Sequence, residues 1–373
     1  MSPAQTFLDQ FGQLPERILM LKGHSAGIGD VLRGSAAWRA LRNAFPKAQL
    51  HLALFTWEPG YASEAFIARH HLLHGFVAVD KKMARLRGWP ALSAWADRTA
   101  RTLQPGLVID FEPAGLYSSF AAWRLGHACG AVTAGVGEFP LRGAFYDIVS
   151  VSTREFARRR GLGFPMEYTC RDFVCLSALG IERNGLPIEL EETEEGRKFR
   201  ENFRERFHIP AQARIIGLNI GCGTPDAVGK RPRLKDLFGL VEGARKAGNA
   251  VVVLTGAKFE RDINQEFIAL WPAEQKPKLL DLAGQTNLLE LAGLIRACDL
   301  FISTDSGPYH IAVALGVPTL AVFRGASPVH YHHEPHVRCM VLGNEAHVAP
   351  AIQAAGELLS GRDFPPDLPA KTK

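Results

Sequence analysis

The chain has 373 residues, more than one domain of ordinary size needs, so we expect two domains. Hydrophobic residues make up 47% and charged residues 22% of the chain, a composition that is typical of soluble globular enzymes and excludes an extended disordered protein. The formal net charge of +5 is mild, and the dense Lys and Arg blocks of a nucleic-acid-binding protein are missing from the sequence.

Cysteine usage and the apolar runs bear on the compartment. The six cysteines are scattered and form no Cys-x-x-Cys pair, so neither a zinc site nor a disulfide framework is expected, and a reducing cytoplasm fits. The first residues carry Asp9 and Glu16 and lack the apolar core of a signal peptide. The longest apolar run, 311–323, is shorter than the ~20 residues that span a bilayer. We expect a cytoplasmic protein and leave open whether it contacts the cytoplasmic face of the inner membrane.

The first half of the chain alternates predicted strands and helices. A strand over 17–22 leads into a glycine-rich loop, 23–30, and then into a helix over 31–45 that Pro46 ends. Further strands are expected at 49–55, 76–80 and 106–111, with a helical segment at 121–125. Alternating buried strands and helices predict a parallel, doubly wound sheet.

A second alternating series begins at residue 213. Strands are expected at 213–220, 250–256, 299–304 and 318–323, and helices at 236–248 and 288–299. The charge-rich stretch 186–207 between the two series is interpreted as a linker plus an exposed helix. We therefore predict an N-terminal Rossmann-like domain over 1–190, a second over 191–349, and a C-terminal helix with a loose tail over 350–373. Two such domains normally face each other across a cleft and bind ligands at the carboxyl ends of their strands.

The loop 23–30 connects the first strand to the first helix. Its glycines allow a ligand to approach the backbone closely, and the start of the helix offers N–H donors. The Gly-x-Gly-x-x-Gly fingerprint of dinucleotide-binding proteins is not matched, because Leu32 takes the third glycine position. Asp30 places a carboxylate at the cleft-facing end of the helix, where it is either an N-cap or a functional group.

Two loops of the second domain carry polar side chains at the same sheet edge. The loop after the first strand combines glycines with Lys230 and Arg231, which suits an anionic group such as a phosphate, although a solvated polar loop has the same composition. Glu260 follows the strand 250–256. It can accept hydrogen bonds from the hydroxyls of a sugar or ribose, and it can equally cap a surface helix.

The stretch 303–310, Ser-Thr-Asp-Ser-Gly-Pro-Tyr-His, separates two apolar runs. Asp305 or Ser306 suits an N-cap, Pro308 suits the first helical turn, and Gly316 ends the helix after about two turns. Capping does not account for His310, which stands in the first turn and is well placed to contact a phosphate. A structural histidine is the alternative.

Four histidines, His330, His332, His333 and His336, form a second polar cluster. Their spacing matches neither His-Glu-x-x-His nor a two-histidine face of a helix, so a His-rich loop is expected in place of a metal site.

Three stretches, 18–52, 107–126 and 299–328, together resemble the heptosyltransferase family, glycosyltransferase family 9. The segments 221–237 and 255–262 also fall in the order and spacing of that family. The resemblance implies the GT-B fold, which consists of two Rossmann-like, doubly wound parallel-sheet domains facing each other across a cleft. It further implies transfer of a sugar from a nucleotide-sugar donor to a growing glycan, with inversion at the anomeric carbon. The usual donor of the family is ADP-heptose, and the usual acceptor is the inner core of lipopolysaccharide.

The resemblance also implies roles for individual residues. Asp30 matches the catalytic aspartate, which acts as the general base, Lys230 matches the lysine that meets the donor phosphates, and Glu260 matches the glutamate near the nucleoside. The donor-binding residues expected on this basis are Gly223, Thr224, Lys230, Glu260, Thr304, Asp305, Ser306, Gly307 and His310, and the acceptor-loop candidates are Ser25, Gly27 and Gly29. No Asp-x-Asp motif occurs in the sequence, so we expect no obligatory cofactor and no metal.

The leading hypothesis is an inverting, metal-independent glycosyltransferase that acts on a nucleotide-sugar donor and a glycan or glycolipid acceptor. Transfer of another sugar onto a different glycan or a protein is an alternative, because the sequence departs from the family pattern at 24–28 and after Asp110. A nicotinamide-dependent oxidoreductase is disfavoured by the unmatched glycine fingerprint. A non-catalytic relative that only binds sugar nucleotides is disfavoured by the presence of Asp30, Lys230 and His310 together.

Overall fold

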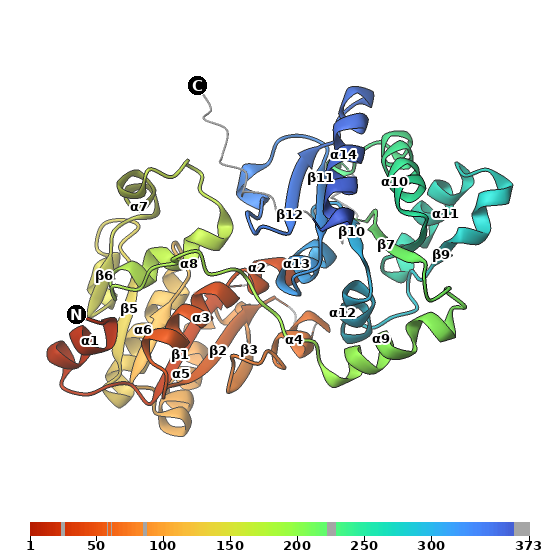
Figure 1. Cartoon of the computed structure of the whole chain (residues 1–373). Coiled ribbons are helices and arrows are strands. Elements are labelled where there is room, and N and C mark those ends of the chain that lie inside the picture. Colours follow the sequence, from red (N-terminus) through yellow and green to blue (C-terminus); the bar gives the residue numbers. More distant parts are fainter. Residues whose placement is uncertain (24–26, 58, 61, 85–87, 222–228, 362–373) are drawn as a thin grey trace. The chain divides into compact units, whose positions relative to one another are not determined.

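The computed structural model describes residues 1–23, 27–57, 59–60, 62–84, 88–221 and 229–361. The chain divides into two compact units, Met1–Ile188 and Glu189–Lys373. Each unit is built on one six-stranded sheet with helices packed against it (Figure 1).

The sheet of the first unit has the strand order β3-β2-β1-β4-β5-β6, and every neighbouring pair is parallel. Its strands are β1 (Arg17–Gly23), β2 (Gln49–Thr56), β3 (Gly75–Asp80), β4 (Leu107–Asp110), β5 (Val132–Val136) and β6 (Ile148–Ser150). The chain winds outward from β1 in one direction and from β4 in the other, so the binding crevice of a doubly wound sheet is expected at the carboxyl ends of these two strands.

The described helices of the first unit are α1 (Pro3–Phe11), α2 (Ile28–Leu32), α3 (Ser35–Ala44), α4 (Ala62–Ile67), α5 (Trp89–Leu103), α6 (Leu116–Cys129), α7 (Thr153–Arg160) and α8 (Tyr168–Ser177). The single helix predicted over 31–45 is wrong, because α2 and α3 are separate helices. The chain turns between them at Gly34, where a Cβ atom would lie 3.0 Å from Asp172 Oδ2 and 3.1 Å from the Val31 carbonyl oxygen. Helix α1 was not predicted, although Ser2 caps it and Pro3 begins it.

The sheet of the second unit repeats the same topology with the order β12-β11-β10-β7-β8-β9, again with parallel pairs. Its strands are β7 (Arg214–Asn219), β8 (Ala250–Thr255), β9 (Leu279–Asp281), β10 (Leu300–Ser303), β11 (Thr319–Phe323) and β12 (Val337–Val341). The change of direction falls between β7 and β10. The predicted pair of doubly wound parallel sheets is therefore confirmed, although β5, β6, β9 and β12 were not predicted as strands.

The described helices of the second unit are α9 (Glu194–Arg206), α10 (Leu234–Gly248), α11 (Arg261–Ala269), α12 (Leu288–Arg296), α13 (Gly307–Ala314) and α14 (Val348–Ser360). The prediction of an exposed helix within 186–207 is wrong in one respect, because one face of α9 buries Phe199 and Phe203. It packs so closely on α12 that a Cβ atom at Gly293 would lie 2.1 Å from the Gly196 carbonyl oxygen. Over the described part of the chain, no helix combines the length and the apolar character that crossing a membrane requires.

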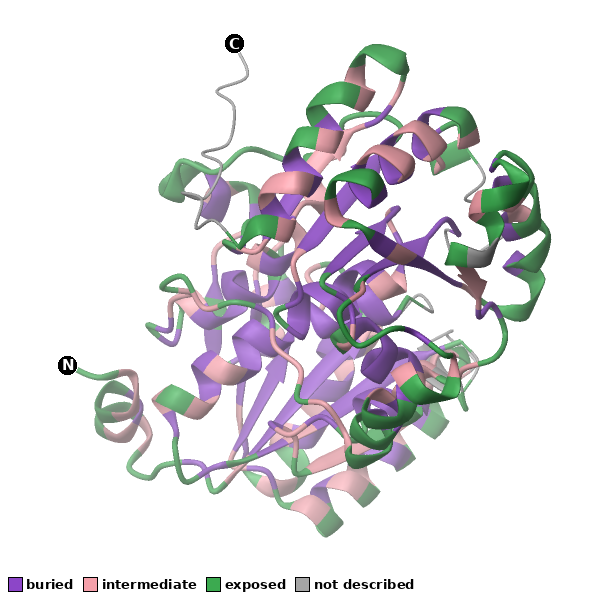
Figure 2. Ribbon diagram, turned by 45° about the vertical axis from the view of Figure 1, so that its right-hand side comes forward, coloured by how far each residue is buried: buried purple, intermediate pink, exposed green. Residues whose placement is uncertain are grey.

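The central strands of both sheets are mostly buried, as Figure 2 shows in purple, whereas the edge strands β3 and β9 are mostly of intermediate exposure. In the first unit β1, β2 and β4 contribute Leu19, Phe55 and Val108 to a core that α5 and α6 cover. Because apolar side chains fill the body of each sheet, polar groups gather where the strands end, and the carboxyl edges are the places to look for a site.

Candidate functional site

The turn between β10 and α13 is held in place by the end of β7. Ser306 Oγ donates a hydrogen bond to Asn219 Oδ1 at 2.9 Å, and the Thr304 amide donates to the Asn219 carbonyl oxygen at 3.2 Å. Thr304 Oγ1 also donates to the Gly221 carbonyl oxygen. Thr304 is fully buried and Ser306 nearly so. The hydroxyl groups of this turn therefore fix its backbone and do not point into solvent.

Ser306, one of the two residues that the sequence offered as the N-cap, is the N-cap of α13, but its side chain makes no capping hydrogen bond. The hydroxyl group is engaged by Asn219 and by the Thr304 carbonyl oxygen instead. Pro308 lies in the first turn, and Gly316 follows the helix with φ +70°. Since the capping role is not taken by the Ser306 side chain, the positive end of the helix dipole suits an anion at this position.

Lys230 and Asp305 form an ion pair beside the same helix start. Lys230 Nζ lies 3.3 Å from Asp305 Oδ2, and the side chain of the lysine is 57% exposed while that of the aspartate is 10% exposed. His330 Nδ1 lies 3.6 Å from the other oxygen, Asp305 Oδ1. The structure thus brings Lys230, Asp305 and the start of α13 together, as predicted, and the exposed ammonium group can contact a phosphate group placed there.

Glu260 lies at the end of β8 and is buried, with 5% of its surface exposed. Its Oε2 accepts a hydrogen bond from the Ala257 amide at 2.8 Å, so it caps the short helix Lys258–Glu260, one of the two roles that the sequence left open. Glycine is required at position 221, after β7, because a Cβ atom there would lie 1.5 Å from Glu260 Oε1. The carboxylate is therefore at the carboxyl edge of the sheet, next to β7.

His310 lies in α13 and is buried, with 6% of its surface exposed. Its Nδ1 is 2.9 Å from His332 Nε2, and His332 Nδ1 is 3.6 Å from Glu334 Oε2. The sequence singled out His310 but gave no signal for this partner, because His332 is 22 residues away and comes from the segment after β11.

A cavity of about 350 Å³ lies at the carboxyl ends of β1 and β4, and of the predicted residues of the first unit Asp30 lines it, whereas Gly27 and Gly29 are not part of the lining. Its lining comprises Lys22, Gly23, Asp30, Arg33, Lys81, Phe111, Glu112, Pro113, Ala114, Tyr168, Arg171 and Asp172. Asp30 is exposed, and the N-cap of α2 is Gly27, so the alternative that Asp30 caps this helix is wrong. Gly29 is buried inside α2. Asp30 therefore lies on the wall of the cavity, at an exposed position in the first turn of α2.

Charge pairs shape the walls of this cavity. Lys22 Nζ contacts both carboxylate oxygens of Asp172, at 2.6 and 2.7 Å, and both side chains are buried. The Gly23 amide donates to Glu112 Oε1 at 3.0 Å. These contacts neutralise one lysine of the lining and fix Glu112 against the end of β1.

A buried network that the sequence did not reveal lies behind the loop after β4. Arg142 Nη2 is 3.2 Å from Asp110 Oδ2, and neither side chain is exposed. Tyr146 donates to Asp110 Oδ2 at 2.6 Å, and the Glu112 amide donates to Asp110 Oδ1 at 3.0 Å. Arg142 also donates to the carbonyl oxygens of Glu112 and Pro113. It therefore shapes the segment that lines the cavity.

Burial decides the protonation of Asp110. Loss of hydration raises the pKa of Asp110 to about 7, and this effect outweighs the opposing influence of Arg142 and of the Tyr146 hydroxyl group. Burial and the negative charge of Asp110 raise the pKa of Tyr146 above its ordinary value, so Tyr146 is a hydrogen-bond donor at neutral pH.

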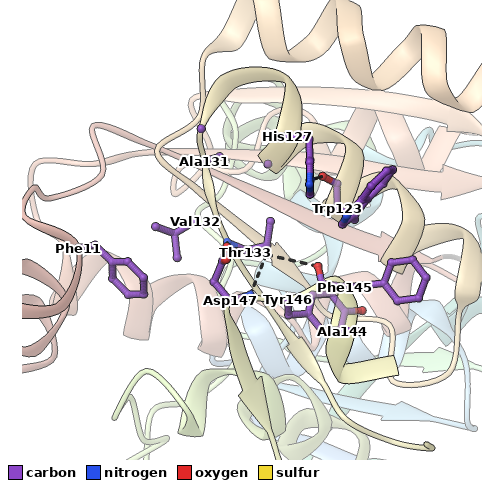
Figure 3. Close-up of a pocket in the computed structure, with 12 residues that line it drawn as sticks. Phe11, Trp123, His127, Ala131, Val132, Thr133, Ala144, Phe145, Tyr146 and Asp147 are labelled. Atoms are coloured by element: carbon purple, nitrogen blue, oxygen red, sulfur yellow. Dashed lines mark hydrogen bonds between the residues drawn. The ribbon is translucent and has the colours of Figure 1, made fainter. Parts of the chain in front are cut away.

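Another cavity of about 400 Å³ lies at the opposite edge of the first sheet, near the start of β5 and the end of α6 (Figure 3). Phe11, Trp123 and Phe145 contribute its apolar walls. The one carboxylate of its lining, Asp147, accepts hydrogen bonds from the amide and the hydroxyl group of Thr133 at 2.8 and 2.9 Å. Because the functional edge of a doubly wound sheet is the carboxyl edge, this cavity is not the candidate site.

Three predicted residues, Ser25, Gly223 and Thr224, lie outside the described residues. Among the residues that are described, no group of three or more His, Cys, Asp or Glu side chains is arranged to hold a metal ion. The five described cysteines, Cys129, Cys170, Cys175, Cys298 and Cys339, are free thiols.

Sequence comparisons relate part of the chain to heptosyltransferases. Residues 238–353 match the model of glycosyltransferase family 9 (heptosyltransferase). Lipopolysaccharide heptosyltransferase 2 of Salmonella typhimurium is 36% identical over 77 residues, which are 21% of this chain and 22% of that protein. Lipooligosaccharide heptosyltransferase 2 of Campylobacter jejuni is 29% identical over 125 residues, 34% of this chain and 38% of that protein. The chain thus matches between about a fifth and two fifths of the length of these curated relatives.

Solved structures extend the similarity over most of the chain. A glycosyl transferase family 9 protein from Veillonella parvula has a TM-score of 0.71 at 20% identity, covering 93% of this chain and 98% of that one. ADP-heptose lipopolysaccharide heptosyltransferase II of Escherichia coli has a TM-score of 0.64 at 18% identity, covering 92% and 98%. Heptosyltransferase WaaC of E. coli, solved with ADP, has a TM-score of 0.62 at 15% identity, covering 90% and 98%. The shared fold confirms the predicted GT-B fold.

Proposed function

We propose that the chain is a member of glycosyltransferase family 9 and that it transfers a sugar from a nucleotide-sugar donor to a lipopolysaccharide-core or other surface-glycan acceptor. The heptosyltransferase relatives, the E. coli ADP-heptose lipopolysaccharide heptosyltransferase II and the WaaC structure with ADP support heptose as the sugar and ADP as the nucleotide. The observation that carries the proposal is the start of α13, where a helix N-terminus, Lys230 and buried hydroxyl groups meet at the carboxyl edge of the second sheet.

The second unit binds the donor in this proposal. The diphosphate lies at the start of α13, where the amide groups of the helix and the ammonium group of Lys230 neutralise it, and Glu260 accepts hydrogen bonds from the nucleoside. The ion pair between Lys230 and Asp305 is exposed at the lysine, so exchanging the aspartate for a phosphate costs little desolvation. Negative charge increases on the diphosphate as its bond to the sugar breaks. The helix amide groups and Lys230 therefore bind the transition state more strongly than the bound substrate.

The first unit supplies the general base. The acceptor hydroxyl group enters the cavity beside Asp30, and its oxygen attacks the anomeric carbon from the face opposite the diphosphate. Its proton passes to the Asp30 carboxylate, and the electron pair of the breaking carbon–oxygen bond leaves with the nucleoside diphosphate. The result is inversion at the anomeric carbon. General-base catalysis of this kind contributes roughly 10²–10⁴-fold to the rate. In this mechanism Lys230 and the helix amide groups neutralise the diphosphate, and Asp30 accepts the proton, so no metal ion is needed.

Release of ADP from ADP-heptose, in the presence of a lipopolysaccharide-core acceptor, tests the proposal directly. We expect turnover by the full chain, loss of roughly 10²-fold or more in kcat for Asp30→Asn, and unchanged ADP affinity in that variant. Asp9→Asn, which alters another exposed aspartate of the same unit, is the matched control and should keep its activity. Near-normal turnover by Asp30→Asn would show that the base is another group, and failure of the full chain to bind any nucleoside diphosphate would refute the donor site.

A further inference from the structure

The positive charge of the chain is concentrated in the first unit. Residues 1–188 contain 21 Lys and Arg against 15 Asp and Glu, a net charge of +6, whereas residues 189–373 contain 22 against 23, a net charge of −1. Four arginines of the first unit stand close together in α7, the helix that follows the edge strand β6 (Figure 1). Such an uneven distribution of charge is typical of a protein that meets an anionic surface.

The arginines of α7 lie on its exposed side. Phe156 is on the buried side of the helix, whereas the side chains of Arg158 and Arg159 are 72% and 58% exposed. Both guanidinium groups lie 2.7 Å from the same carboxylate oxygen, Glu155 Oε1, so one negative charge is shared by two positive charges. Because exposed ion pairs contribute little to stability, these guanidinium groups can exchange Glu155 for phosphate groups at little cost.

Exposed apolar side chains accompany these arginines. In the loop after α7, Leu162 is 39% and Phe164 is 53% exposed. The guanidinium carbon of Arg154 lies 5.2 Å from the centre of the Phe164 ring, so the loop folds back onto the start of the helix. Apolar and basic groups are therefore on one surface of the first unit.

A second loop, 137–141, brings a further apolar side chain to the same place. Glu138 accepts hydrogen bonds from the amide and the hydroxyl group of Thr153, at 2.8 and 2.7 Å, and these bonds join the loop to the first residue of α7. Leu141 is 87% exposed and has φ +69°, in the left-handed region that a leucine rarely adopts. The fold thus holds a large apolar side chain in solvent on an unfavourable backbone, which indicates a function for it.

A lipid bilayer accounts for both kinds of side chain. Exposed apolar groups enter the boundary between the headgroups and the acyl chains, while arginines beside them reach the lipid phosphates. Anionic lipids add an attraction for each arginine near the surface. An acidic protein or a nucleic acid would use the arginines but would leave the apolar side chains in water, so the bilayer is the better match.

We propose that this face of the first unit binds an anionic phospholipid bilayer. The α7 surface consists of Leu141, Arg154, Arg158, Arg159, Leu162 and Phe164. Its apolar side chains enter the bilayer boundary and its arginines contact lipid phosphates, without nucleotide or acceptor. The consequence for turnover rests on the proposed function. Helix α8 follows the loop and contributes Tyr168 and Arg171 to the lining of the first-unit cavity, so a glycolipid acceptor in the same bilayer is presented beside that cavity.

Co-sedimentation of the full chain with vesicles tests the inference in the absence of any sugar nucleotide. We expect binding to vesicles of equimolar phosphatidylglycerol and phosphatidylcholine, and much weaker binding to phosphatidylcholine alone. Arg154→Gln with Arg158→Gln should weaken binding about tenfold or more, because each arginine near an anionic surface contributes about fivefold. Leu162→Ser with Phe164→Ser should weaken it by about tenfold or more as well, and this loss should persist at high salt, which screens only the charges.

Matched pairs of substitutions elsewhere serve as controls. Arg98→Gln with Arg101→Gln removes two exposed arginines from α5 of the same unit. Leu14→Ser with Leu270→Ser removes two leucines that are 47% and 44% exposed. Neither pair should change vesicle binding. Melting temperatures equal to that of the unsubstituted chain check that every variant is folded.

ADP release separates this inference from the proposed function. With an acceptor embedded in vesicles, both variants of the α7 surface should raise KM. With a delipidated core oligosaccharide as acceptor, they should leave kcat and KM unchanged, because they do not touch the cavity. A chain that binds vesicles but releases no ADP with either acceptor refutes the proposed function alone.

Three outcomes refute the inference while turnover of the oligosaccharide upholds the proposed function. The first is equal binding to the two kinds of vesicle. The second is vesicle binding by the variants of the α7 surface that equals binding by their controls. The third is an oligomer that Leu162→Ser with Phe164→Ser converts to a monomer without a change in vesicle binding, which would make this surface a contact between copies of the chain.

Discussion

Replacement of Arg142 by Met tests whether the buried network behind the first-unit cavity holds that unit together. The change removes a fully buried guanidinium group that donates to Asp110, to Ser119 Oγ at 2.9 Å and to the Val136 carbonyl oxygen at 2.9 Å. It also removes the donors to the carbonyl oxygens of Glu112 and Pro113. The aliphatic part of the side chain is retained, so the loss of volume is small and the loss of hydrogen bonds dominates.

The expected loss of stability follows from leaving Asp110 buried without its cation. Removal of one partner of a buried ion pair typically lowers the free energy of unfolding by about 3–5 kcal/mol. For a unit of this size each kcal/mol corresponds to roughly 2–4 °C, so the melting temperature of the first unit should fall by about 6–20 °C. Arg158→Met is the control, because Arg158 makes an exposed pair with Glu155, and loss of such a pair lowers stability by only about 0.3–0.5 kcal/mol.

The loss should also depend on pH in a defined direction. The pKa of Asp110 is about 7 in the folded chain, above its ordinary value, so this group binds more protons in the folded than in the unfolded state, and its contribution to stability falls as pH rises from about 4 to 7. Arg142 lowers this pKa. Without it the folded pKa moves higher, and the decline continues above pH 7. The stability difference between Arg142→Met and the unsubstituted chain should therefore be larger at pH 8.5 than at pH 6.

Calorimetric and urea unfolding at these two pH values measure both effects. A melting temperature for Arg142→Met no lower than that of Arg158→Met would refute the argument that the buried pair matters. A loss that is equal at pH 6 and pH 8.5 would refute the assignment of the pH dependence to Asp110. In the proposed reaction the variant should also raise KM for the acceptor, since Arg142 shapes the segment 112–113 that lines the cavity, without changing ADP affinity.

Three further predictions concern the donor site, acid stability and metal dependence. Lys230→Met should weaken ADP binding about tenfold or more in calorimetry. Lys235→Met, which changes another exposed lysine nearby, should leave the affinity unchanged. Equal affinities of the two variants would show that Lys230 does not contact the diphosphate. Burial lowers the pKa of both His51 and His74, aided by His74 and Arg17 at His51 and by Arg42 at His74. These two rings therefore take up protons more readily in the unfolded state, and their contribution to stability should be lost as pH drops below about 6.5. In urea unfolding, His51→Gln should reduce this pH dependence of the free energy of unfolding. An unchanged dependence would show that groups other than His51 cause it. Turnover should persist in excess EDTA, and loss of activity that added Mg²⁺ restores would overturn the metal-free mechanism.

The sequence predicted the parts of the fold that local patterns encode. The apolar runs that became β1, β7, β8 and β10 stand between glycines and charges, so their bounds were visible. The short strands β6 and β9 have only three residues each, too few to show a periodicity, and they form because neighbouring strands pair with them. Helix α9 looked exposed because charges surround Phe199 and Phe203, and only its packing on α12 shows which face is buried.

The candidate site likewise contains residues that could be placed together from the sequence and partners that could not. Lys230, Asp305 and Ser306 follow strands that end at one sheet edge, so topology alone placed them together. The partners of Asp110 and His310 were not predicted, because Arg142 and His332 approach from 32 and 22 residues away and through loops whose course no local rule gives. Long-range polar contacts of this kind depend on tertiary packing.

The start of α13 shows why a binding turn can look like an ordinary cap. A serine in the N-cap position normally satisfies an amide of the first turn and adds about 1 kcal/mol to stability. Here the Ser306 hydroxyl group is diverted to Asn219, and Thr304 to Gly221, so both side chains fix the backbone of the turn and neither satisfies the helix. An anionic ligand can then supply the interaction that the cap does not. Restoring a side-chain cap would therefore stabilise the free protein and weaken binding of the diphosphate, which makes the missing cap a functional feature of the proposed site.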